Sequence, residues 1–316
     1  MRWRRLRFSN TAPAPLRALA PTLALALAGC AAGAASVPRV RPGRLLVVGA
    51  ESQYANVLAQ VGGRYVTARA IERNPNTDPH SYEASPAIAA LIAKARLVVQ
   101  NGLGYDAFMS RLEAASPARG RQVIVVQRLL HLPSSTPNPH LWYSPRTMPA
   151  VARAIAGALG TLEPAHAAYF RARAARFDAS LRAWRAALLT FARRHSHAPV
   201  AVTEPVSNYL LEAAHARILT PFQFQADLMN GVDPPPQDVA LEQELLARRR
   251  VAAFVYNRQV TDPLTRALLA LARRSRVAVV AAYETMPPGY DYQAWMLAET
   301  RALERAVAAH ISTERL

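Results

Sequence analysis

The chain has 316 residues, 51% of them apolar, and a formal net charge of +17. This length and composition suffice for one large or two medium domains with substantial cores. The high charge raises the question of nucleic-acid binding. However, the arginines lie mainly on predicted helices, with no interleaved aromatic residues and no recognised binding motif. We therefore interpret them as solvated helix faces and expect no nucleic-acid partner.

The N-terminal segment 1–29 is predicted to be a signal peptide, because an arginine-rich start precedes an apolar stretch at 18–28. That stretch is too short to cross a bilayer, which needs about 20 apolar residues. It ends in Leu27-Ala28-Gly29-Cys30, which resembles the lipobox of bacterial lipoproteins, where the signal is cleaved before an acylated cysteine. A lone cysteine in an exported protein cannot form an internal disulfide. We therefore expect Cys30 to be lipidated rather than an accidental thiol, and removal of the five signal arginines would leave a charge of +12.

A tether and a first α/β lobe are predicted next. Residues 30–43 are small and Pro-rich, which is typical of a flexible tether. Residues 44–145 alternate between strand and helix patterns and are predicted to form the N-terminal lobe. Strands are expected at 45–48, 65–71, 97–100 and 122–126, and helices at 52–61, 85–95 and from about 105.

A helical region is predicted at 146–197. After a helix at 145–160, the stretch from Pro164 to about Arg194 contains no internal Gly or Pro. A continuous helix of that length would span about 45 Å. Its apolar side chains fall on one helical face: Phe170, Phe177, Leu181, Trp184 and Leu188. We expect this helix to be a rigid connector.

The segment 198–316 is predicted to form the C-terminal lobe. Strands are expected at 200–202, 217–220, 251–256 and 277–282, and helices at 206–214, 236–247, 263–273 and 292–310, with a loop before 236. Interleaved strands and helices indicate parallel sheets. The predicted fold class is α/β: two lobes, each with a mostly parallel sheet flanked by helices, joined by one long rigid linker helix.

Four potential metal ligands lie at or after the ends of predicted strands: His80, His140, Glu204 and Glu284. Ligands of open α/β sheets gather beyond the carboxyl ends of the strands, so these side chains can meet between the lobes. Two imidazoles and two carboxylates suit a divalent ion such as Zn(II) or Mn(II). Affinity should fall as the pH drops through about 6, because the imidazoles must be neutral.

Other interpretations of these residues stay open. A lone His in a loop is usually structural, a Glu at a strand end often caps a helix, and His131 is a candidate extra ligand. A metallohydrolase would need a base beside a metal-bound water. No H-E-x-x-H motif is present, and the spacing of Asp78 and Glu83 specifies nothing, so we expect no enzyme. A binding protein for an organic metal chelate, such as a siderophore or cobalamin, would share the architecture without protein ligands. A structural or adhesive lipoprotein has no positive sign in the sequence.

Six short motifs, in order, carry a resemblance to a known family. They are the lipobox, Asn76-Thr-Asp-Pro-His80-Ser-Tyr-Glu83, Asn138-Pro-His140-Leu-Trp-Tyr143, Thr203-Glu204-Pro205 with Asn208-Tyr-Leu210, Met229-Asn-Gly231, and Tyr256-Asn-Arg-Gln-Val-Thr-Asp-Pro263. Together they resemble the zinc/manganese-binding lipoproteins of bacterial metal ABC importers over nearly all of the chain after the signal.

The resemblance implies a monomeric solute-binding protein, exported and lipid-anchored in the periplasm or at the cell surface. It would capture a divalent ion in the interlobe cleft and deliver it to a membrane permease driven by a cytoplasmic ATPase. By this resemblance His80 and His140 match two shared ligand positions. Glu204 stands where many zinc members have His and many manganese members have Glu, and Glu284 where Asp is usual.

The choice of metal depends on the donor set. Zn(II) binds a given nitrogen and oxygen site more tightly than Mn(II), so zinc is the first expectation and manganese the alternative. Two bidentate carboxylates would raise the coordination number toward what manganese prefers. The sequence also lacks the long His-rich loop common in zinc members of the family.

Overall fold

The computed structural model describes residues 43–74 and 85–316, which all belong to the unit Val37–Leu316. The expected signal peptide, Cys30 and His80 lie outside the described residues. Among the described helices, none combines the length and the apolar character needed to cross a membrane.

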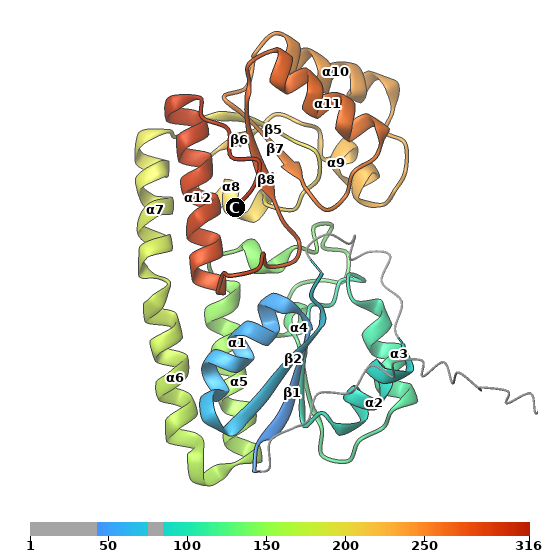
Figure 1. Cartoon of the computed structure of the whole chain (residues 1–316), viewed down its shortest axis with the longest axis vertical. Coiled ribbons are helices and arrows are strands. Elements are labelled where there is room, and N and C mark those ends of the chain that lie inside the picture. Colours follow the sequence, from blue (N-terminus) through green and yellow to red (C-terminus); the bar gives the residue numbers. More distant parts are fainter. Residues whose placement is uncertain (1–42, 75–84) are drawn as a thin grey trace, which may run out of the picture. The chain divides into compact units, whose positions relative to one another are not determined.

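The first sheet is entirely parallel, with strand order β2-β1-β3-β4. Its strands are β1 (Leu45–Glu51), β2 (Val66–Glu72), β3 (Leu97–Gln100) and β4 (Gln122–Val125). Helices α1 (Ser52–Gly62), α2 (Pro86–Lys94), α3 (Ala107–Ala115) and α4 (Val126–Leu129) accompany it (Figure 1). Alternate residues of a strand point to opposite faces, so Val47 and Val99 pack in one apolar cluster with α1, and Val48 and Val98 in a second one with α2 and α3.

The connecting helices are α5 (Thr147–Leu162), α6 (Ala167–Ser180) and α7 (Arg182–Arg194). The single helix expected from 164 to 194 is wrong in two details: residues Pro164–His166 form a 3-10 turn, and the α-helix is interrupted at Leu181. The Ser180 hydroxyl donates to the Phe177 carbonyl at 2.6 Å and competes with the helical pattern there. Leu181 nevertheless keeps a right-handed helical conformation, with φ −78° and ψ −3°, so α7 continues the course of α6 as a bent connector.

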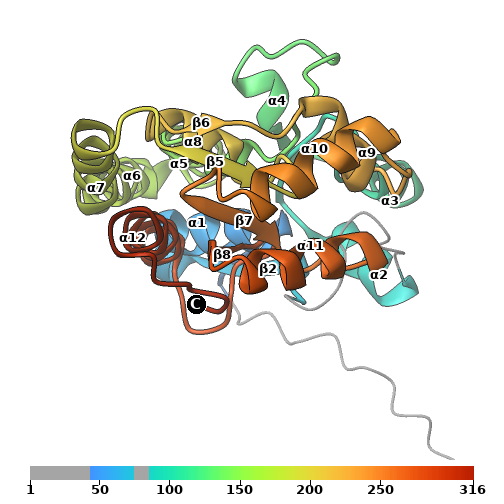
Figure 2. The same ribbon diagram turned by 90° about the horizontal axis from the view of Figure 1, so that it is seen from above.

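The second sheet repeats the arrangement of the first with strand order β6-β5-β7-β8 (Figure 2). Its strands are β5 (Pro199–Val202), β6 (Arg217–Ile218), β7 (Ala253–Asn257) and β8 (Ala278–Ala282). Its helices are α8 (Asn208–Ala213), α9 (Phe222–Met229), α10 (Pro236–Ala247), α11 (Pro263–Arg274) and α12 (Tyr292–Ala309). Helix α9 lies where the sequence predicted a loop. Its Phe224 is fully buried, so packing rather than local propensity explains the helix.

The larger apolar cluster is continuous across both halves of the chain. It joins residues of β1 and α1 to residues of β5, β7 and β8 through the connecting helices. Helix α12 packs beside α7 (Figures 1 and 2), and the Trp184 indole donates to the Thr300 hydroxyl at 3.0 Å. The predicted fold class is confirmed: two lobes, each a four-stranded parallel sheet flanked by helices, joined by a long helix that is bent.

Candidate metal-binding site

His140 is fully buried in the segment between α4 and the 3-10 turn Leu141–Tyr143. Its Nδ1 lies 2.8 Å from the Asn138 side-chain oxygen. The Asn138 amide nitrogen donates to the Pro205 carbonyl at 2.8 Å, so the oxygen of that amide must be the group that faces the ring. Nδ1 therefore carries the proton, and Nε2 presents a lone pair. This tautomer is the one that a metal ligand needs.

Glu204 and Glu284 follow the carboxyl ends of β5 and β8, and Asn257 ends β7 between them. The Asn257 amide nitrogen donates to Glu204 Oε2 at 3.1 Å and to Glu284 Oε1 at 2.6 Å. Its oxygen accepts from the Gln259 backbone N–H at 3.0 Å, which fixes the amide orientation. One amide thus holds both carboxylates at the same edge of the sheet.

Glu284 also contacts the first lobe. Its Oε2 accepts from the Tyr105 hydroxyl at 2.9 Å and lies 3.4 Å from His140 Nε2. Burial first, and then the charge of Glu284, raise the pKa of Tyr105 well above its usual value, so the phenol remains a hydrogen-bond donor. The Glu284 backbone N–H donates to the Gln259 side chain at 2.6 Å. The carboxylate is therefore fixed by groups from both halves of the chain.

Buried acids also lie at the carboxyl edge of the first sheet. Glu51 ends β1 and pairs in register with Glu72 of β2, and Asp106 follows β3. All three side chains are buried. Burial, followed by the charges of Asp106 and Glu72, raises the pKa of Glu51 well above its usual value. Burial likewise raises the pKa of Asp106 to about 6, although backbone N–H groups of Gly102 and Asn101 bond to its carboxylate.

Three of the four predicted ligands are connected in the structure, either by direct contact or through Asn257. His140 meets Glu284, and Asn257 links Glu284 to Glu204. No three His, Cys, Asp or Glu side chains among residues 43–74 and 85–316 form a group that could hold a metal ion by themselves. His131 is exposed in a left-handed turn after α4, with φ 54°.

Sequence reasoning gave no role to Asn138, Tyr105, Asn257 or Glu51. Asn138 and Asn257 belong to motifs quoted for the family resemblance, and Glu51 ends a strand. A search for polar residues in these motifs and at strand ends would have found these three. Tyr105 lies at the start of a predicted helix, and only the fold shows that it reaches Glu284.

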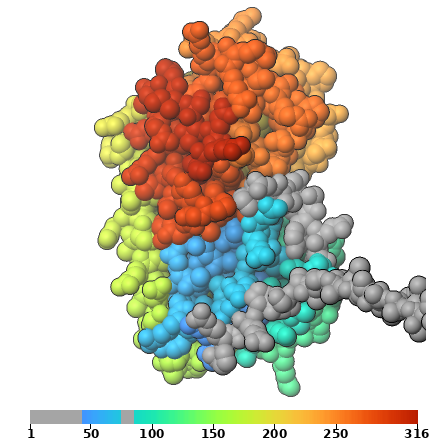
Figure 3. Space-filling view, in the orientation of Figure 1, coloured from blue at the N-terminus to red at the C-terminus, as the bar shows by residue number. Residues whose placement is uncertain are grey.

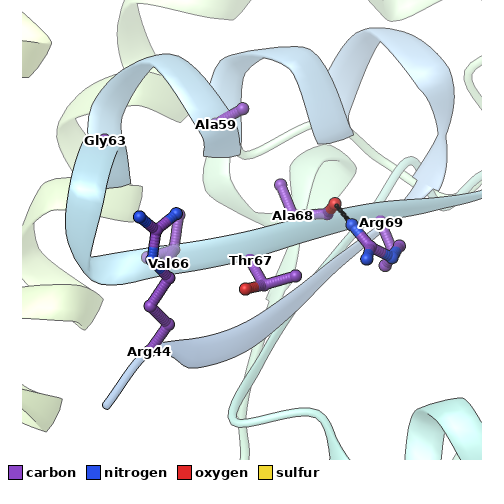
Figure 4. A pocket seen from close by; sticks show the side chains of 7 residues that line it. All are labelled: Arg44, Ala59, Gly63, Val66, Thr67, Ala68 and Arg69. Carbon is purple, nitrogen blue, oxygen red and sulfur yellow. Dashed lines mark hydrogen bonds between the residues drawn. The ribbon is translucent and has the colours of Figure 1, made fainter. Parts of the chain in front are cut away.

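A separate pocket lies between the C-terminal end of α1 and the edge strand β2 (Figure 4). Arg44 and Arg69 contribute guanidinium groups to its lining, and none of its lining residues is a His, Cys, Asp or Glu. Two fixed positive charges disfavour a metal cation. The pocket is therefore not a second candidate for the metal site.

Solved structures share this fold. One is the periplasmic zinc binding protein TroA from Treponema pallidum, with a TM-score of 0.68 and 18% identity over 85% of this chain and 100% of that chain. Another is the manganese-bound periplasmic metal binding protein from Candidatus Liberibacter asiaticus, with a TM-score of 0.68 and 17% identity over 84% of this chain and 100% of that chain. The sequence profile of the family ZnuA, described as zinc-uptake complex component A periplasmic, matches residues 47–306. The chain therefore belongs to the ZnuA family, the periplasmic metal-binding proteins of metal ABC importers.

Proposed function

We propose that this protein captures one divalent transition-metal ion with His140, Glu204 and Glu284, together with His80 from the segment outside the described residues. The separation of His140 Nε2 and Glu284 Oε2, 3.4 Å, is the main support. Two ligand atoms at about 2.1 Å from a tetrahedral zinc ion lie about 3.4 Å apart. The two acceptor atoms therefore already have the spacing that one shared ion requires.

Zinc is the first candidate for the ion and manganese the second. An imidazole with carboxylates binds both, and the usual affinity order favours zinc. The Asn257 amide bonds to one oxygen of each carboxylate. Release of these bonds would let a carboxylate bind with both oxygens, as the higher coordination number of manganese demands.

We also propose that the protein delivers the ion to an ABC permease and its ATPase, which membership of the ZnuA family supports. We further propose that Cys30 is the lipid attachment site, that residues 30–43 tether a monomeric metal-binding body of residues 44–316 to the membrane, and that the protein has no enzymatic activity. Mass spectrometry of the exported protein tests the anchor. A diacylglyceryl adduct on an N-terminal Cys30 is expected, and an unmodified cysteine within a longer chain would contradict it.

Calorimetric titration of the metal-stripped protein with Zn(II) and Mn(II) tests the site. One tight site is expected in the wild type, with strong loss of affinity in His140→Ala. A matched control is His131→Ala, which removes an exposed imidazole nine residues earlier and should leave affinity unchanged. Absence of binding for both ions would discard the site and favour the organic chelate as the ligand.

A further inference from the structure

The hydroxyl of Tyr143 joins the two segments that carry His140 and Glu284. Tyr143 lies three residues after His140, and its oxygen is 2.8 Å from the carbonyl oxygen of Tyr283, the residue before Glu284. The same hydroxyl oxygen accepts from the Tyr283 backbone N–H at 3.2 Å. One side chain from the first ligand segment therefore bonds to both backbone groups next to the ligand of the second segment.

Helix α12 supplies Glu299, the third residue in this hydrogen-bonded cluster after Tyr143 and Tyr283. Its two carboxyl oxygens lie 2.8 and 2.9 Å from the Tyr143 hydroxyl, and Oε1 accepts from the Trp295 indole at 2.6 Å. Helix α12 forms part of the surface (Figure 3), but the Glu299 side chain is only 3% exposed. The next residue, Thr300, accepts from Trp184 of α7. Tyr143 and Glu299 thus connect both ligand segments to α12, and the Thr300 bond to α7 is a separate contact of the same helix.

Counting protons assigns a charge state to this cluster. The Tyr143 hydroxyl has one proton, but Glu299 Oε1, Glu299 Oε2 and the Tyr283 carbonyl are three acceptors around it. If Glu299 were ionised, Tyr143 could donate its proton either to the Tyr283 carbonyl or to the Glu299 carboxylate, and the other acceptor would receive no bond from Tyr143. A Glu299 protonated on Oε2 donates to Tyr143, which then donates to the carbonyl, while Trp295 donates to Oε1. Every group is then paired, as buried polar groups require.

We propose that Tyr143 and an uncharged Glu299 are positioning residues of the metal site, which set the spacing of His140 and Glu284 by joining both segments to α12. This inference rests on the proposed metal ligands. Besides Tyr143, the Trp295 indole and the Tyr283 backbone N–H bond to the Glu299 carboxyl, and neither of these groups carries a charge. Groups that orient ligands typically change metal affinity by about 10- to 100-fold when removed.

The experiment compares Zn(II) dissociation constants of the metal-stripped full chain and three variants by chelator competition. Tyr143→Phe should weaken binding about ten-fold or more, because the link to Tyr283 is lost. Glu299→Gln should stay within about three-fold of the wild type, because its amide donates and accepts as the acid does. Thr300→Val is the matched control: it removes another buried bond from α12, to Trp184, and should lower the melting temperature without changing affinity.

A measurement without metal separates this inference from the proposed function. Amide hydrogen exchange at Tyr283 should be faster in Tyr143→Phe than in the wild type or Thr300→Val, whether or not an ion binds. Unchanged exchange, or unchanged affinity in Tyr143→Phe, would overturn the positioning role. A loss of affinity in Glu299→Gln as large as in Tyr143→Phe would overturn the uncharged state. A wild type that binds no ion would refute the ligand assignment, while exchange still decides whether Tyr143 orders the segment.

Discussion

Replacement of Glu299 by Gln should stabilise the protein in a pH-dependent way. Burial raises the pKa of Glu299 from 4.5 to about 8 in the folded protein, although its hydrogen-bond contacts with Tyr143 and Trp295 act to lower it. A raised carboxyl pKa means that the stability contribution is complete below pH 4.5 and is lost as the pH rises through 8. Between pH 5 and pH 8 the wild type should lose about 3 kcal/mol from this group, an order-of-magnitude value. The Gln side chain does not titrate, so it does not lose this contribution. The difference in unfolding free energy between Glu299→Gln and the wild type should therefore be larger at pH 8 than at pH 5 by the same amount.

Urea unfolding of both proteins at pH 5 and pH 8, without metal, measures this difference. All other titrating groups are common to both proteins and cancel. Glu242→Gln is a useful comparison, because burial also raises the pKa of Glu242 on α10 to about 8. The two carboxyls share no hydrogen-bond partner, so their effects should add in the double variant. If the Glu299→Gln difference is the same at both pH values, the carboxyl is ionised in the folded protein and the proton count is wrong.

Three further outcomes follow from the site. Asn257→Ala should weaken metal binding about 10- to 100-fold in chelator competition, because it removes the amide that bonds to both Glu204 and Glu284; an unchanged affinity would refute the orienting role of the amide. Glu204→His should raise the ratio of zinc to manganese affinity, since an imidazole favours zinc over manganese, and an unchanged ratio would argue that Glu204 is not a ligand. An ion at 100 times its dissociation constant should add about 2.7 kcal/mol of stability. At constant ion concentration, the shift in melting temperature should shrink between pH 7.5 and pH 5.5, because protons compete with the ion for imidazole ligands, and equal shifts would contradict imidazole ligation.

The sequence predicted the two lobes because their strands are short apolar runs separated by clear helix signals. Pro263 after Asp262, for example, marks the start of α11, and the structure has Asp262 accepting from the Thr265 backbone N–H at the helix cap. Helix α9 was missed because Pro221 before it and Asn230-Gly231 after it are turn signals, and its eight residues are too few for a clear period. The interruption at Leu181 is accompanied by the bond of the Ser180 hydroxyl to the Phe177 carbonyl, and no propensity argument would single out Ser180.

The site was predictable in its ligands but not in its supporting groups. Glu204 and Glu284 follow strands of the second sheet, and His140 lies in the segment beyond the last strand of the first sheet. The rule for parallel sheets therefore expects them beyond the carboxyl edges of the two sheets. Tyr105, Tyr143 and Glu299 act from helices or turns, and Glu299 reaches the site through a contact 156 residues away in sequence. Such contacts depend on how α12 packs against the connecting helices, which no local pattern encodes. A buried acid on a helix otherwise looks the same in sequence as a solvated one.

The contacts between the lobes also indicate how the ion enters. Among the hydrogen bonds that join the lobes near the site are those of Tyr105 with Glu284, Asn138 with Pro205, Tyr143 with Tyr283 and Met286 with Ser52. At about 1 kcal/mol each, their loss alone would place a state with separated lobes about 4 kcal/mol above the closed one, a population of about one in a thousand. Separation would also expose the apolar cluster that runs through both lobes. A local rearrangement that separates Glu284 from the Asn257 amide breaks one hydrogen bond, of 2.6 Å. Its cost is therefore smaller than the cost of separating the lobes. We therefore expect metal exchange to reorganise the ligand segments while the lobes stay together, as the bent connecting helix and α12 require.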